Sequence, residues 1–197
     1  MATCCLTVGI AWFSFASPSL APSEVPVFEV TPIASSVGFD VRASVKIKGQ
    51  FDKWGATITF QSPDVTTGAL EINIQADSVD TGSGMKNRKL KGKDFFDVEH
   101  YPAITFKSTK IVPVSHEHFE VDGDLIIRGV TNPEKLTLIA SHDEGHLGDI
   151  KGKMVFDRKK YGMNKGIPFI SIADHVEIDI HLKTKHTGGP QLALKKQ

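Results

Sequence analysis

The feature of this sequence that most restricts its fold is a regular alternation of apolar and polar residues. Between residues 37 and 47 every second residue is apolar, and the residues between them are polar or glycine. Successive side chains of a β-strand point to opposite faces, so this period of two predicts a strand with one buried face. A strand of that length would extend about 36 Å, roughly twice the usual value. The apolar positions are Val37, Phe39, Val41, Ala43, Val45 and Ile47.

Shorter segments with the same alternation follow, separated by turn sequences rich in Gly, Pro, Asn and Asp. We count about eight strands in one domain over residues 27–185, and expect residues 186–197 to form a disordered tail. Such a chain is all-β and forms a sandwich or a closed antiparallel barrel. Long strands favour the barrel, because closure removes exposed edges. The later inward-facing residues are predicted to be Ile58, Phe60, Leu70, Ile72, Ile74, Ala76, Ile104, Phe106, Phe119, Val121, Leu136, Leu138, Ala140, Met154, Phe156, Val176, Ile178, Ile180 and Leu182.

One interval, residues 83–98, lacks the period of two and is rich in Lys and Arg. We predict one short basic helix between Met85 and Lys93, interrupted by Gly92. The pair Phe95 and Phe96 follows at once. Two adjacent aromatic side chains in a charged segment indicate that they fill an apolar space in the fold.

The first 21 residues have the composition of a secretory signal peptide. Within it, residues 5–21 contain no charged side chain, are too few to cross a bilayer comfortably, and end in small residues. We expect cleavage after Ala21, with Ala16 as the alternative; a buried N-terminal strand is the competing interpretation. Cleavage would remove Cys4 and Cys5, so disulfides would play no part in the mature protein. The expected location is periplasmic or secreted.

The balance of charges argues against two classes of partner. Lys and Arg number 23, Asp and Glu number 23, and the formal net charge is zero. Proteins that bind nucleic acids, or that adhere to anionic membranes through a polybasic patch, usually carry a basic excess. We therefore expect no nucleic-acid partner and no stable insertion into a membrane.

The sequence contains no G-x-S-x-G, H-E-x-x-H or phosphate-loop motif, so we expect no enzymatic activity and no cofactor. His116 and His118 would lie on one face of a strand, within reach of a single metal ion. No third ligand accompanies them in sequence. We interpret them as solvated surface histidines and expect no metal site; a metal-assisted enzyme that uses them is the alternative.

The inward faces are rich in phenylalanine and branched aliphatic residues, which leaves two interiors open. The barrel packs solid, or it encloses an elongated apolar slot for a ligand. The residues predicted to project into the barrel and to line such a slot include Phe39, Val41, Phe60, Ile72, Ile74, Phe106 and Phe156.

Two stretches in order, "DFFDVEHYPAITF" (94–106) and "IIRGVT" (126–131), are specific for one known family. With "SSVGFDVRASVKIKGQFDKWGATITF" and "FDRKKYGM", they make the chain from about Val27 to Lys185 resemble the polyisoprenoid-binding, YceI-like family of bacterial periplasmic proteins. The resemblance implies an extended lipocalin-like antiparallel barrel with an internal slot for a long isoprenoid lipid, such as a polyprenyl phosphate or an isoprenoid quinone. It implies no catalytic residue.

The resemblance also gives roles to the basic segment. Phe95 and Phe96 would help to line or close the slot, and Arg88, Lys89 and Arg158 would meet the lipid head group at the mouth. The chain departs from the family where Ser35 replaces a common histidine and where Lys89 replaces another. A homodimer and the role of a ligand-free structural or stress protein of the envelope remain open alternatives.

Overall fold

The computed structural model describes residues 24–44, 47–142, 147–166 and 171–193; the predicted signal peptide at 1–21 lies outside these ranges. The described chain contains ten strands, one α-helix and three short 3₁₀ helices. The strands are β1 (Val27–Ala43), β2 (Ile47–Phe51), β3 (Trp54–Thr59), β4 (Ala69–Gln75), β5 (Val79–Asp80), β6 (Ala103–Pro113), β7 (His118–Ile127), β8 (Val130–His142), β9 (Leu147–Asp157) and β10 (Ile172–Gly188). The helices are η1 (Val65–Thr67), η2 (Ala76–Ser78), α1 (Gly84–Lys91) and η3 (Arg158–Tyr161).

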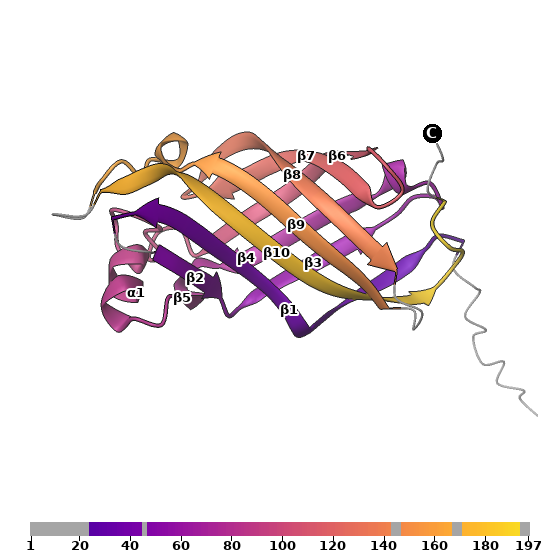
Figure 1. Ribbon diagram of the computed structural model, residues 1–197, viewed down its shortest axis with the longest axis horizontal. Helices are drawn as coiled ribbons and strands as arrows, with labels where there is room; N and C mark the ends of the chain where they lie inside the picture. Colours follow the sequence, from indigo (N-terminus) through magenta and orange to yellow (C-terminus); the bar gives the residue numbers. More distant parts are fainter. Residues whose placement is uncertain (1–23, 45–46, 143–146, 167–170, 194–197) are drawn as a thin grey trace, which may run out of the picture.

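The strands form one curled antiparallel sheet in the order β3-β4-β6-β7-β8-β9-β10-β1-β2-β5 (Figure 1). The prediction of an all-β, lipocalin-like antiparallel fold with one short helix is confirmed, although the strands number ten rather than eight and the described sheet curls into an incompletely closed barrel whose edge strands β3 and β5 do not pair. The sheet wraps around an elongated interior, and α1 lies at one end of it (Figure 1). Ring contacts help to bring the curled sheet together: Phe28 of β1 and Phe60, just after β3, lie 5.8 Å apart between centroids.

The predicted single strand over 37–47 is wrong in its second part. β1 ends at Ala43, β2 begins at Ile47, and the two strands pair antiparallel with Val41 opposite Ile47. Directly opposed residues face the same side of a sheet, and these two are separated by an even number of positions. The period of two therefore continues through the reversal and hides it. Val45 lies outside the described residues.

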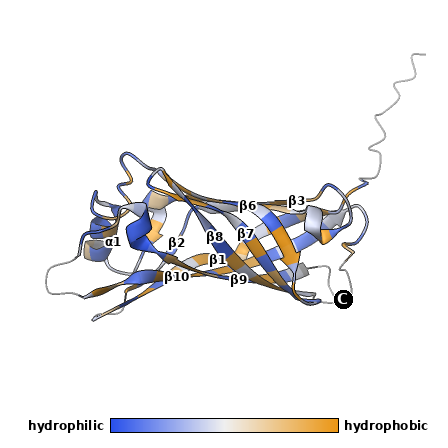
Figure 2. Ribbon diagram, turned by 90° about the horizontal axis from the view of Figure 1, so that it is seen from above, coloured by the Kyte–Doolittle hydropathy of each residue, from blue (hydrophilic) through white to orange (hydrophobic). Residues whose placement is uncertain are grey.

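Hydrophobic and hydrophilic residues alternate along the strands (Figure 2), and this alternation places one face of the sheet in the core. In β7 every second residue from Phe119 to Ile127 is buried, including Gly123. A Cβ atom at Gly123 would lie 2.5 Å from the ring of Phe106. Glycine at this inward position thus leaves room for the Phe106 ring to lie against the wall.

The chain ends differently from the prediction. β10 extends to Gly188, and Ala193 forms a parallel bridge with Asp64 beside η1. Leu192 packs against the core. The expectation of a disordered tail is therefore wrong for residues 186–193, because main-chain pairing and apolar burial hold them; residues 194–197 lie outside the described ranges.

Candidate functional site

The barrel interior contains an apolar slot at the end near α1. About 960 Å³ of space between atoms belongs to it, including space open to solvent. Its lining residues are Val37, Phe39, Val41, Ile47, Phe51, Ile72, Ile74, Leu90, Phe95, Phe96, Ile104, Phe106, Leu125, Ile127, Met154, Phe156, Arg158, Met163, Ile172, Val176, Ile178 and Ile180.

The structure brings all but one of the predicted lining residues together around this slot. Only Phe60 lies elsewhere. Phe39, Phe51 and Phe96 follow one another along the wall, with ring centroids 5.6 and 5.7 Å apart. Phe95 is buried beside them. The aromatic pair after the basic helix therefore lines the slot beside α1.

The α1 helix is held over the barrel by polar contacts to β5. Nδ2 of Asn87 donates to Asp80 at 2.9 Å, and its Oδ1 accepts from the backbone N–H and hydroxyl of Thr81. The helix ends at Lys91, with Gly92 as its C-cap, and its buried residue, Leu90, lines the slot. The predicted helix is confirmed, and its apolar side is part of the slot wall.

Two of the predicted head-group residues lie on α1. Arg88 is exposed. Nζ of Lys89 lies 2.7 Å from Asp94 Oδ2 and 5.8 Å from the centre of the Phe95 ring. The hydrogen bond from Lys89 lowers the pKa of the Asp94 carboxyl, so that Asp94 is ionised and holds the lysine next to the aromatic end of the slot. Contact of either cation with a ligand stays a prediction.

The third predicted head-group residue, Arg158, is buried and is the one charged residue among the described residues that line the slot. Its guanidinium donates to the backbone carbonyls of Met163, Lys165 and Ala173 and forms an ion pair with Asp174 at 3.3 Å. Most of its donors are thus already used by the chain. This geometry makes Arg158 a clamp that holds the segment after η3 against the start of β10.

Phe60 belongs to a second apolar chamber at the far end of the barrel, together with Ile58, Leu70 and Leu138 among others. The slot and this chamber share no described lining residue. Val121 and Leu136 are fully buried and line neither of them. Along β7, Phe119 lines the chamber, Val121 follows, and Leu125 lines the slot. A packed layer therefore separates the two cavities.

Several lining residues were not singled out from the sequence. Leu125 and Ile127 continue the alternation of β7 and could have been found by extending it. Met163 lies in the irregular segment after η3, where no periodicity exists. Only the tertiary fold, through the Arg158 clamp, brings Met163 to the slot.

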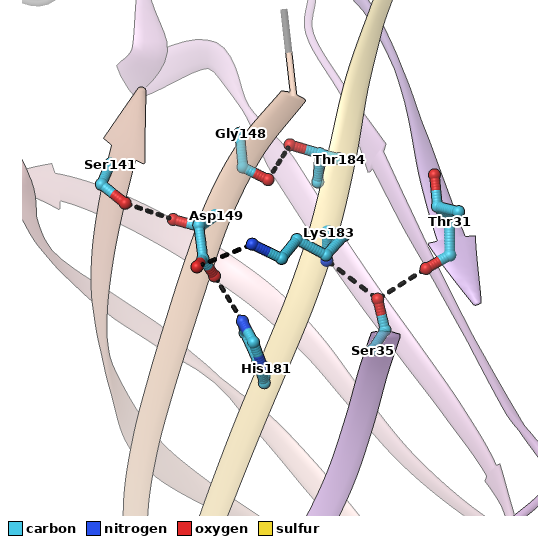
Figure 3. Close-up of polar contacts among 8 residues, drawn as sticks. All are labelled: Thr31, Ser35, Ser141, Gly148, Asp149, His181, Lys183 and Thr184. Atoms are coloured by element: carbon cyan, nitrogen blue, oxygen red, sulfur yellow. Dashed lines mark hydrogen bonds and ion pairs between the residues drawn. The ribbon is translucent and has the colours of Figure 1, made fainter. Parts of the chain in front are cut away.

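A polar cluster lies on the outer face of β9 and β10, where β1 shifts its register (Figure 3). Asp149 accepts from Lys183 at 3.0 Å and lies 2.5 Å from His181 Nε2. Burial alone would raise the pKa of the Asp149 carboxyl, but the hydrogen bonds from Lys183 and His181 lower it overall. Ser35 accepts from the backbone N–H of Lys183 and donates to Thr31, so it bridges the irregular part of β1 and does not line the slot.

Among the residues that the structure describes, His116 and His118 do not gather with other metal-binding side chains. His116 lines the far chamber, whereas Nδ1 of His118 lies 3.1 Å from the hydroxyl of Ser115. In the described part of the chain, no group of three or more His, Cys, Asp or Glu residues is placed to hold a metal ion. Within the same ranges, no helix combines the length and apolarity needed to span a membrane.

Solved structures share this architecture. BcnA of Burkholderia cenocepacia superimposes with a TM-score of 0.72 at 27% identity, over 79% of this chain and 99% of that chain. A domain of Saccharophagus degradans described as polyisoprenoid-binding superimposes with a TM-score of 0.64 at 16% identity, over 81% and 98% of the two chains. The latter likeness shows the fold alone.

Sequence comparison places the chain among proteins of the same kind. A UPF0312 protein of Vibrio cholerae is 25% identical over 142 residues, which are 70% of this chain and 73% of that protein. The YceI-like domain matches residues 28–184, nearly the whole of the described barrel. The chain therefore belongs to the YceI-like domain family.

Proposed function

We propose that this protein binds a long-chain isoprenoid lipid in the slot and stores or transports it in the bacterial periplasm without chemical change. The observation that carries the proposal is the slot itself, whose described lining is apolar apart from the already engaged Arg158. The name of the Saccharophagus degradans domain, described as polyisoprenoid-binding, supports the class of ligand. The resemblance to periplasmic relatives supports the location.

The physical basis is transfer of hydrocarbon out of water. Each buried methylene contributes about 0.8 kcal/mol, so a five-carbon isoprene unit contributes about 3–4 kcal/mol before costs. Loss of rigid-body and chain freedom offsets much of this gain. Several units in an apolar slot lined by aromatic and branched side chains would still give tight binding.

The head group would stay at the mouth, where Arg88 and Lys89 lie at the α1 end. Two cations suit a phosphate better than a neutral quinone, because charge-assisted hydrogen bonds are about twice as strong as neutral ones. We therefore propose a polyprenyl phosphate as the preferred ligand. Arg158 would act mainly by holding the wall, since its donors already meet carbonyl oxygens and Asp174.

The test is titration of lipid-stripped protein with a polyprenyl phosphate and with the polyprenol of the same length. Both should bind, the phosphate more tightly. The substitution Lys89→Gln should reduce the difference between them, whereas Lys153→Gln on the outside of β9 should not. If neither lipid binds, the proposal is refuted. If the wild-type protein binds the phosphate and the polyprenol with equal affinity, the role of the cations is refuted.

A further inference from the structure

Two basic segments of the chain meet beside the slot, at the end of the barrel where α1 lies. Residues 84–93 contain five Lys or Arg and no acidic residue, and residues 158–165 contain four and no acidic residue. Leu90 from the first segment and Arg158 and Met163 from the second line the same slot. Lys93 and Lys165, one from each segment, both contribute to lowering the pKa of Asp94, behind the hydrogen bond from Lys89. Fold, rather than overall composition, thus concentrates positive charge at this end.

Most of these cations are available at the surface. Arg88, Lys93, Lys160 and Lys165 are exposed, and in the described part of the chain none of the four forms an ion pair. Their neighbours Lys89 and Lys159 pair with Asp94 and Asp174 and fix the local backbone. We call the two basic segments, residues 84–93 and 158–165, the rim. The rim carries exposed cations although the net charge of the whole chain is zero.

An exposed apolar residue lies in the same rim. Met85 is 83% exposed and lies one helical turn before Arg88, so the two share a face of α1. The α1 helix lies at one end of the barrel (Figure 1). Cations that flank an exposed apolar side chain are the composition of surfaces that rest in the head-group region of a bilayer.

We propose that this end of the protein docks reversibly on an anionic phospholipid bilayer, with the mouth of the slot facing the lipid. The proposal rests on the proposed function, because a lipid with no stable place in water must enter the slot from a membrane. Positive charge complements the phosphates, Met85 enters between the head groups, and the slot residues contributed by the two basic segments come to lie next to the bilayer. The contact is peripheral and breaks when the salt concentration rises.

The test uses co-sedimentation of the purified protein with phosphatidylcholine vesicles, with and without phosphatidylglycerol. The triple variant Lys93→Gln, Lys160→Gln, Lys165→Gln removes rim charge and spares the predicted head-group residues. A cation near an anionic membrane contributes about fivefold in affinity, so three should contribute about 100-fold. The matched control, Lys110→Gln, Lys151→Gln, Lys185→Gln, removes the same charge from exposed positions away from the mouth.

Binding that requires phosphatidylglycerol, falls about 100-fold in the rim variant and survives in the control would support the proposal. Absence of binding by the wild-type protein, or equal loss in both variants, would overturn it. Met85→Ser should weaken binding several-fold without changing its salt dependence; unchanged affinity would overturn insertion of Met85. Polyprenol binding in solution is measured on the same variants, so that failure of docking and failure of the slot to bind lipid are told apart.

Discussion

Replacing Ile178 with Trp is expected to block the slot without unfolding the barrel. Ile178 lies in the middle of β10, between Phe39 of β1 and Met154 of β9, and it faces the interior. Its neighbours Val176 and Ile180 on the same face are buried, but Ile178 is only partly buried. A central, inward-facing residue with strands on both sides is exposed only to the slot, so a larger side chain there has free space to enter.

The expected magnitudes separate an open slot from a packed core. In a packed core the added ring would cost about 1–3 kcal/mol of unfolding free energy. For a domain of this size that lowers Tm by about 2–12 °C. In an open slot the indole occupies ligand space, so Tm of the lipid-free protein should change by less than about 2 °C while lipid binding is largely lost.

The assay combines thermal unfolding of lipid-free protein with titration of a polyprenyl phosphate. Val155→Trp is the matched control, because Val155 faces outward on β9 and is 53% exposed. The control should leave both quantities unchanged. A drop of many degrees in Ile178→Trp would show that the interior is packed at this level, and unchanged lipid binding would show that the lipid does not pass Ile178; either result refutes the reasoning.

Three further predictions concern the wall and the polar cluster. Leu136→Ala should cost about 2–5 kcal/mol in urea unfolding, because Leu136 is fully buried in the layer between the cavities; a cost below about 1 kcal/mol would contradict that packing. Gly123→Ala should destabilise by about 1–3 kcal/mol through collision with Phe106, whereas Gly55→Ala, with no atom within 4 Å of the new methyl, should lie within about 0.5 kcal/mol of wild type. The lowered pKa of Asp149 means that its contribution to stability is present above the unfolded-state value of about 4 and is lost as the pH falls through the lower folded-state value. Asp149→Asn should therefore destabilise at neutral pH and converge with wild type in strong acid, and a constant difference at all pH values would argue against the ion pairs.

The sequence predicted the wall of the barrel because alternation reports directly which residues face inward. It did not predict the reversal between β1 and β2, since opposed residues such as Val41 and Ile47 keep the same parity through the turn. It also placed Phe60 in the slot, although that residue lies beyond the layer of Val121 and Leu136. Periodicity shows which face of a strand a residue lies on. It does not show on which side of the packed layer between the two cavities that residue lies.

The mouth was the least predictable part. Arg158 was expected to meet a head group, yet its donors meet carbonyl oxygens of its own chain, a contact that only the folded path of the segment after η3 creates. Likewise, zero net charge suggested no basic patch, whereas the fold gathers residues 84–93 and 158–165 at one end. Sums over a sequence do not reveal how the fold distributes charge.

The measurement that tests the central claim most directly is mass spectrometry of an organic extract of the purified protein, with the Ile178→Trp protein extracted in parallel. Binding of a long isoprenoid chain predicts a near-stoichiometric isoprenoid lipid in the wild-type extract and a strongly reduced amount in the variant. An extract without isoprenoid, from wild-type protein that also fails to bind a polyprenyl phosphate on titration, would contradict the account and favour a ligand-free structural role.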